Sequence, residues 1–131
     1  MTSSPTWPER ELKADEQRQA ADSLQVSAET VDGAAVVSAV GEVDSLTAHL
    51  LRDELARQLD ATPSRLVVDL SRIDFLGSVG LSALVAAAER GSAGGTALHL
   101  VAGRTVRRVI DATGLHPVLT VHDDLAAALA G

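Results

Sequence analysis

Residues 24–40 contain two short runs in which β-branched and other apolar residues dominate. The first is Leu24 to Thr30 and the second is Ala34 to Val40. The residues between them are Val31-Asp32-Gly33, in which Asp-Gly is a typical sequence for a tight hairpin turn. The pattern therefore predicts two antiparallel strands at the start of the folded domain.

The rest of the chain switches repeatedly between helical spacing and short apolar runs. The expected helices are Leu46 to Leu59, Ser78 to Arg90, about Arg104 to Thr113 and Asp123 to Ala130, and the expected strands are Leu66 to Leu70, Thr96 to Val101 and Val118 to Val121. Gly91 and Gly114 stand where the second and third helices should be capped, and Thr47 is expected to cap the first. The order ββαβαβαβα predicts one α/β domain with a mixed, mostly parallel sheet of about five strands and about four helices.

Residues 1–22 differ from the domain, which we take to span residues 23–131. From Glu9 to Gln19, Leu12 is the only large apolar residue, so this stretch has no apolar stripe to pack against a core. A segment of that composition cannot bury enough surface to fold alone. We expect residues 1–22 to be a flexible or partly helical N-terminal extension.

Composition narrows the possible functions. The chain has no cysteine, which excludes disulfides, thiolate metal sites and a cysteine nucleophile. Its formal net charge of −7 opposes binding to nucleic acids and anionic membranes, and the cluster Arg104, Arg107 and Arg108 is too small to reverse that. No apolar run approaches the roughly 20 residues of a membrane span, and no signal peptide is recognisable. We expect a cytoplasmic protein without direct nucleic-acid or membrane contacts.

Neither a metal nor a cofactor is expected. The histidines His49, His99, His116 and His122 are scattered, and none has a second ligand at metal-binding spacing. The chain also lacks a phosphate-binding loop of the Walker type and a dinucleotide-binding fingerprint.

The most informative stretch is Phe75-Leu76-Gly77-Ser78-Val79-Gly80-Leu81. It places Ser78 between glycines, where a buried strand leads into a helix whose free N–H groups favour an anion such as a phosphate on the serine. A plain N-cap is a second interpretation of Ser78. The nucleophile elbow of hydrolases is matched only in part, because a glycine two residues before the serine is missing. A hydrolase would also need His49, His116 or His122 as its base.

The same stretch resembles the signature loop of STAS domains, the family of anti-sigma-factor antagonists and sulfate-transporter tails. Three other segments resemble the family, and they occur in the same order as in the family. Gly41 to Ala48 resembles its Gly-x-x-Asp segment, Leu66 to Leu70 resembles its central strand, and Thr113 to Leu115 resembles the end of its third helix. The resemblance covers about Leu24 to Gly131. It departs at Gly77, where the family commonly has Asp, and at Val79, where it commonly has Ser or Thr.

The resemblance implies a regulatory binding protein that has no catalytic residue of its own. Ser78 takes the place of the serine that is phosphorylated by a partner acting as both anti-sigma factor and serine kinase, and a phosphatase would reverse the modification. The unmodified form would bind that partner and free a sigma factor, whereas a phosphate on Ser78 would switch binding off. The residues expected to face the partner are Asp44, Leu46, Thr47, Leu76, Gly77, Val79, Gly80 and Leu81.

Several alternatives stay open at the level of sequence. Asp44 is interpreted equally well as a turn or capping residue at the first helix. Asp69, at the end of the buried strand, is expected to be a hydrogen-bonded structural carboxylate. A STAS scaffold subunit of a regulatory or transport assembly, never phosphorylated, competes with the switch, and a small serine hydrolase is a further alternative. The oligomeric state is left open by the sequence.

Overall fold

A computed structural model describes residues 23–131, which contain five strands and four helices. They are β1 (Leu24–Val31), β2 (Ala34–Val43), α2 (Ala48–Asp60), β3 (Arg65–Leu76), α3 (Ser78–Gly94), β4 (Ala97–Ala102), α4 (Arg104–Thr113), β5 (Thr120–His122) and α5 (Leu125–Ala130). The sheet has the order β1-β2-β3-β4-β5. The strand β1 is antiparallel to β2, and all other neighbours are parallel. The predicted fold class and element order are confirmed, whereas the predicted extension, residues 1–22, lies outside the described residues.

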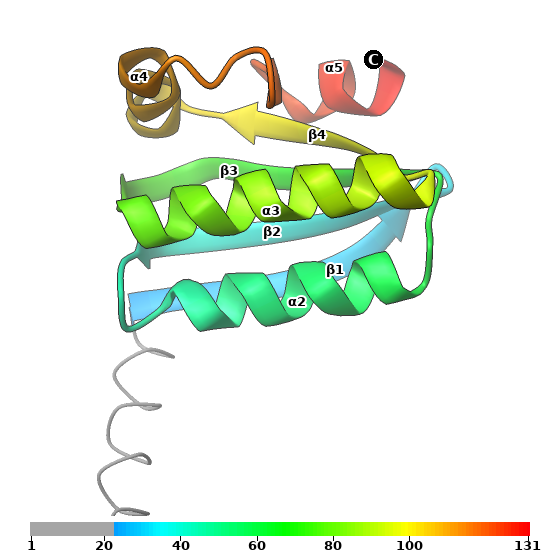
Figure 1. The fold of residues 1–131 in the computed structure, drawn as a ribbon, viewed down its shortest axis with the longest axis horizontal. Helices are drawn as coiled ribbons and strands as arrows, with labels where there is room; N and C mark the ends of the chain where they lie inside the picture. The colour runs from blue at the N-terminus through cyan, green and yellow to red at the C-terminus, as the bar shows by residue number, and fades with distance from the viewer. Residues whose placement is uncertain (1–22) are drawn as a thin grey trace, which may run out of the picture.

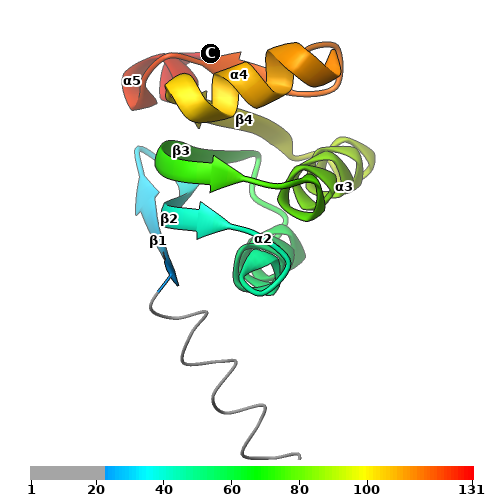
Figure 2. The same ribbon diagram turned by 90° about the vertical axis from the view of Figure 1, so that its left-hand side faces the viewer.

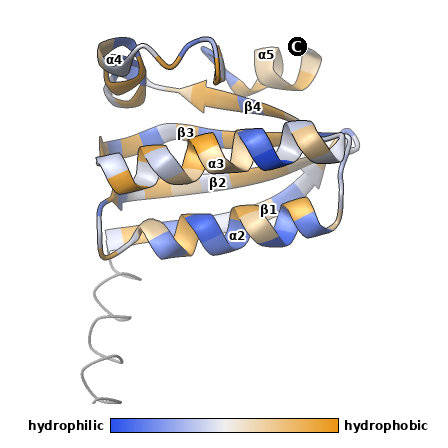
Figure 3. Cartoon of the chain, viewed as in Figure 1, coloured by the Kyte–Doolittle hydropathy of each residue, from blue (hydrophilic) through white to orange (hydrophobic). Residues whose placement is uncertain are grey.

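Helices cover the two faces of the sheet unequally (Figures 1 and 2). The helices α2 and α3 run side by side across one face, and α4 adds Val106 and Ile110 to the same core. On the opposite face, α5 closes a smaller cluster of Val36, Val67 and Val101. The hydropathy colouring shows β2 and β4 as largely apolar and α2 as an alternation of hydrophobic and hydrophilic positions (Figure 3). Within the described part of the chain, no helix is long and apolar enough to cross a membrane.

The hairpin between β1 and β2 turns at Asp32 and Gly33. Their φ angles are 51° and 82°, so both residues lie in the left-handed region. Two such residues in succession form the type I′ turn that suits a two-residue hairpin, and asparagine, aspartate and glycine tolerate it best. The turn predicted from the sequence is therefore confirmed.

Strand β3 runs six residues beyond the predicted end at Leu70. It stays paired with β2 up to Val43↔Leu76, through two irregularities in register. Polar residues within 71–74 break the apolar run, so the sequence pattern ended the strand too early. The extension matters because it carries the chain to the point at which α3 begins.

Helix α3 is longer than predicted, and Gly91 is not its cap. Gly91 is buried within the helix, where its carbonyl accepts a hydrogen bond of 2.8 Å from the amide of Thr96. Gly95 takes the left-handed capping conformation instead, with a φ of 85°. The predicted cap of α4 is confirmed, since Gly114 has a φ of 70° and donates to the carbonyl of Ile110.

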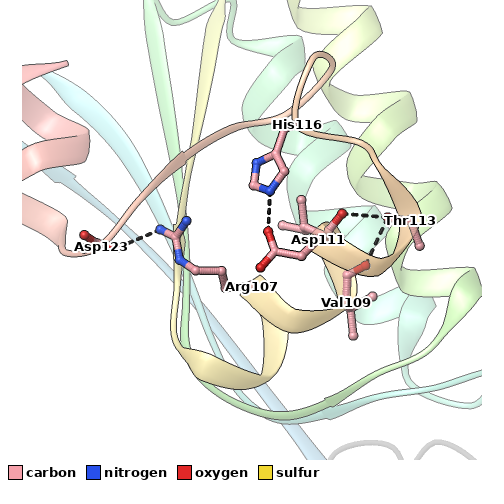
Figure 4. A network of polar contacts seen from close by, with 7 residues as sticks. Arg107, Val109, Asp111, Thr113, His116 and Asp123 are labelled. Atoms are coloured by element: carbon pink, nitrogen blue, oxygen red, sulfur yellow. Dashed lines mark hydrogen bonds and ion pairs between the residues drawn. The ribbon is translucent and has the colours of Figure 1, made fainter.

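Ion pairs tie α4 to the segments that follow it (Figure 4). The Arg107 guanidinium lies 2.6 Å from a carboxylate oxygen of Asp123, just before α5. The His116 ring contacts the Asp111 carboxylate in the same network. One member of the predicted arginine cluster is thus neutralised within the domain.

Candidate functional site

Two loops meet at the edge of the sheet where β2 and β3 end. Figure 1 shows α2 and α3 starting at this same edge, because β2 and β3 are parallel neighbours. The Gly77 amide donates a hydrogen bond of 2.8 Å to the carbonyl of Val43 and joins the loops directly. The segment around Asp44 and the segment around Ser78 therefore form one surface, as the resemblance implied.

Ser78 is the first residue of α3 and is exposed. Gly77, in an extended conformation with φ −84° and ψ 174°, is the N-cap, so the interpretation of Ser78 as a plain N-cap is wrong. Among residues 23–131 the Ser78 hydroxyl has no hydrogen-bond partner. It lies free at a helix start, where unpaired N–H groups and the helix dipole favour negative charge.

Large apolar side chains are exposed around this serine. Leu46 is 46% exposed, Phe75 is 49% exposed and Val79 is 48% exposed. The β-carbon of a side chain at Gly77 would come within 3.3 Å of the Phe75 ring, which places that ring against the start of α3. Clustered exposed apolar residues of this size are typical of protein-binding surfaces.

Phe75 is a site residue that the sequence analysis missed. The predicted strand ended at Leu70, so Phe75 was placed in the loop before the helix and was not assigned to a face of the sheet. The signal that could have found it is the pair Phe75-Leu76, since neighbouring residues of a strand point to opposite faces. Leu76 is 4% exposed, and Phe75 points the other way.

Four of the residues expected to face the partner are buried. Thr47 is 1%, Leu76 is 4% and Leu81 is 7% exposed, and Gly80 is buried as well. A β-carbon on Gly80 would lie 2.4 Å from Cγ1 of Val43, so the helix and β2 touch there. Thr47, Leu76 and Gly80 support the surface from beneath, whereas Leu81, although 7% exposed, lines a groove beside Ser78.

The geometry favours the turn interpretation of Asp44. Its carboxylate accepts hydrogen bonds from the amides of Leu46, at 2.9 Å, and Thr47, at 3.0 Å. The Thr47 hydroxyl donates to the Glu42 carbonyl at 2.7 Å and accepts from the Asp44 amide at 2.9 Å. Thr47 holds the N-cap position of α2 as predicted, but its side chain bonds back to the loop and makes no cap bond to the helix.

Asp69 is a structural carboxylate, as expected. One of its oxygens accepts hydrogen bonds from the Ser71 amide at 3.0 Å and from the Ser71 hydroxyl at 2.7 Å. These bonds hold the backbone of β3 at the point where its pairing with β2 changes register. Asp69 therefore shapes the strand that leads to the site and does not reach Ser78.

A shallow groove begins at Ser78 and follows α3. It has a volume of about 370 Å³, and its lining residues are Ser78, Leu81, Ser82, Val85, Ala86, Glu89 and Leu115. The groove is open and mixed in polarity, and it lies between α3 and the loop after α4. A partner that covers Ser78 can extend along it.

The histidines are arranged differently from the scattered pattern expected. His99 on β4 and His122 on β5 come together, with Nδ1 of the first 2.9 Å from Nε2 of the second. Burial, the Arg65 guanidinium and His122 together hold the pKa of His99 below its ordinary value. In residues 23–131 no group of three or more potential metal ligands occurs. None of the four histidines forms a hydrogen bond with Ser78, so the hydrolase alternative has no base.

Comparison with known proteins decides the family. Residues 25–128 match the family described as STAS domain. The chain belongs to the STAS domain family. The resemblance noted in the sequence is therefore confirmed at the level of the family.

Relatives of this STAS domain carry related names. The anti-sigma-F factor antagonist RsfB of Mycobacterium tuberculosis is 36% identical over 112 residues, which cover 86% of this chain and 92% of the relative. A crystal structure of an anti-sigma factor antagonist from Mycobacterium paratuberculosis is 39% identical, covers 83% of this chain and 93% of that one, and superposes with a TM-score of 0.78. The Bacillus cell fate determinant SpoIIAA in its phosphorylated form is 19% identical, covers 79% and 96%, and shares the fold with a TM-score of 0.61.

Proposed function

We propose that this STAS domain is an anti-sigma factor antagonist, a regulatory binding protein that captures an anti-sigma factor through the surface around Ser78. The names of the relatives above support the assignment, since they match the chain at 36% and 39% identity over most of its length. The exposed apolar side chains of Leu46, Phe75 and Val79 supply the contact area that such binding needs.

Phosphorylation of Ser78 switches this binding off. The anti-sigma factor is the serine kinase, and a phosphatase restores the binding form. The observation that carries the proposal is an exposed hydroxyl, without a partner among the described residues, next to exposed apolar side chains such as that of Val79. A phosphate adds about −1.5 to −2 charges there, which a partner fitted to a neutral hydroxyl cannot solvate.

The fold itself tolerates the modification. The start of α3 offers free N–H groups and the positive end of a helix dipole, both of which stabilise an attached phosphate. Gly77 contributes no carboxylate that would repel it, in contrast to the aspartate common in the family. The switch therefore changes the surface and leaves the packing unchanged. The phosphorylated form of SpoIIAA, which has the same fold, is consistent with this.

Val79 replaces a hydroxyl residue of the family pattern with a half-exposed apolar side chain. The replacement leaves Ser78 as the only hydroxyl in the signature loop and adds apolar contact area next to it. We therefore assign the modification to Ser78 alone, and assign to Val79 a part in holding the unmodified partner.

The test uses purified chain, the co-encoded anti-sigma factor kinase and ATP. Mass spectrometry should find one phosphate on the wild type and none on Ser78→Ala. In the absence of ATP, Ser78→Asp should bind the kinase at least about tenfold more weakly than the wild type, a loss of about 1.4 kcal/mol. Ser92→Asp, which places the same charge at the exposed far end of α3, is the matched control and should bind normally.

Two results would contradict the proposal. Equal affinity of the kinase for wild type and Ser78→Asp would remove the switch, and absence of phosphate with every co-encoded kinase would favour the unmodified scaffold subunit. Thermal unfolding of each variant separates loss of binding from loss of fold, because a surface switch should leave the melting temperature nearly unchanged.

A further inference from the structure

The face of the sheet opposite α2 and α3 is only partly covered. Helix α5 packs over Val36, Val67 and Val101, of which Val36 and Val67 lie near the starts of β2 and β3. Figure 2 shows α5 on the side of the sheet away from α2 and α3. Toward the ends of β2 and β3, Val40 and Phe75 are 41% and 49% exposed, so no described element covers this part of the face.

Two register shifts determine which β3 residues reach the open face. Pairing passes from Ser38↔Asp69 to Val40↔Arg72 and from Gly41↔Ile73 to Glu42↔Phe75, so β3 has one extra residue at each shift. An extra residue reverses the alternation of a strand. Ile73 and Leu76 consequently point into the core, at 4% exposure each, whereas Arg72 and Phe75 point outward.

Val40, Glu42, Arg72 and Phe75 thus form a four-residue patch, which we call the β2–β3 patch. Phe75 also belongs to the surface around Ser78, so a dimer formed through this patch competes with the anti-sigma factor for that ring. Val40 lies beside Arg72 and Glu42 beside Phe75. The apolar residues Val40 and Phe75 therefore lie at opposite corners of the patch. The charged residues Glu42 and Arg72 lie at the other two corners. Arg72 and Glu42 form no ion pair with each other or with another residue of the described chain.

The free state of Arg72 stands out against the other arginines. Arg52, Arg57, Arg90 and Arg107 each lie within 4.0 Å of a carboxylate, and Arg65 donates to the backbone carbonyls of Ala128 and Gly131 at the end of the chain. Arg104 and Arg108 on α4 have no partner among the described residues either, but no exposed large apolar side chain belongs to α4. Among the arginines of residues 23–131, only Arg72 combines a charge without an ion-pair partner with apolar neighbours on the same face.

We propose that the β2–β3 patch is a dimer interface that binds a second copy of this chain. A symmetric interface requires a surface that is complementary to itself. A twofold axis along the diagonal from Val40 to Phe75 exchanges the positions of Glu42 and Arg72. Each Arg72 then meets the partner's Glu42, while the apolar side chains on the axis meet their own copies.

A second copy fits this patch better than other kinds of partner. Nucleic acid would meet the Glu42 carboxylate, and the net charge of −7 opposes it. In such a dimer the apolar side chains would meet at the centre of the interface, and the charged pairs would lie on either side of them. An apolar centre with polar contacts around it is the usual composition of a specific interface. The patch is small, so the dimer it forms is a weak one that depends on concentration.

Charge reversal tests the pairing directly. In sedimentation experiments on the full chain over a wide range of concentrations, Arg72→Glu and Glu42→Arg should each raise the dimer dissociation constant by at least about tenfold. Each single variant places like charges opposite each other twice, once for each symmetric contact. The double variant Arg72→Glu/Glu42→Arg should regain the dimer, because it reverses both partners of every contact.

Arg108→Glu, which changes an exposed arginine on α4 in the same way, is the control and should dimerise like the wild type. A wild type that stays monomeric at all concentrations would overturn the proposal, as would a double variant no better than either single one. Melting temperatures confirm that each variant is folded. Ser78→Asp should dimerise normally, so failure of the switch and failure of the dimer are distinguishable.

Discussion

The amide of Gly77 donates a 2.8 Å hydrogen bond to the carbonyl of Val43. This contact ties the loop that presents Ser78 to the end of the neighbouring strand, so the two halves of the surface are held in register before any partner arrives. A pre-formed surface loses little conformational entropy on binding. A change in charge at Ser78 can therefore alter affinity without rearranging the domain.

The close approach of Gly80 to β2 should make this position intolerant of any side chain. In Gly80→Ala the new methyl group would lie 2.4 Å from Cγ1 of Val43 and 2.8 Å from Cδ1 of Leu76. We expect a loss of roughly 1–3 kcal/mol in the free energy of unfolding, measured by urea denaturation. Gly94→Ala has no atom within 4 Å of its new methyl group and should be neutral or slightly stabilising. Equal effects of the two changes would contradict the packing described.

The buried hydroxyl of Thr47 should contribute to the stability of the domain through its hydrogen bonds. Thr47→Val keeps the shape but removes the acceptor for the Asp44 amide and the donor to the Glu42 carbonyl. We expect the free energy of unfolding to fall by about 1–3 kcal/mol, because buried polar groups lose their partners. The same change at the exposed strand residue Thr30 should have little effect. Chemical denaturation of both variants measures the difference.

Leu46 should contribute to partner binding and not to stability. Leu46→Ser removes a side chain that is 46% exposed beside the Ser78 loop, so the domain should melt at nearly the same temperature. Affinity for the anti-sigma factor should fall about tenfold, or about 1.4 kcal/mol, measured by titration calorimetry. Val118→Ser is the control, because Val118 has a similar exposure of 42% but lies before β5. A larger loss of affinity with Val118→Ser would show that the anti-sigma factor binds to a different surface.

The His99–His122 contact should make stability depend on pH. The pKa of His99 is lowered in the folded domain by burial, by Arg65 and by His122, so folding favours the neutral ring. The corresponding stability is complete above the ordinary value of 6.5 and is lost as the pH falls from there toward the lower folded-state pKa. We expect His99→Gln to flatten this part of the profile of unfolding free energy against pH. A wild-type profile that stays flat over this pH range would contradict the assignment.

Much of the fold followed from local pattern. The hairpin at Asp32-Gly33 and the end of α4 at Gly114 were predicted because each depends on a residue that accepts a left-handed conformation. Gly91 misled the prediction for the opposite reason. Its role comes from contact with Thr96 in the loop before β4, which the local sequence does not encode.

Some features of the candidate site also follow from local sequence, whereas others depend on packing. The position of Ser78 at a helix start and its exposure follow from the signature loop. The burial of Thr47, Leu76, Gly80 and Leu81 required knowledge of how α3 packs on β2. Phe75 was missed because its direction depends on a register shift in β3, which only the pairing with β2 reveals.

The sequence by itself determined the order of elements, the hairpin turn, the position of Ser78 at the start of a helix and the family. These depend on residue types and spacings within a few positions, because periodicity and backbone preferences act locally. Tertiary structure decided which side chains lie on the surface, how His99 meets His122, and that Arg72 and Glu42 share an open face without pairing. Those features depend on strands far apart in the chain, and one inserted residue in a strand reverses them.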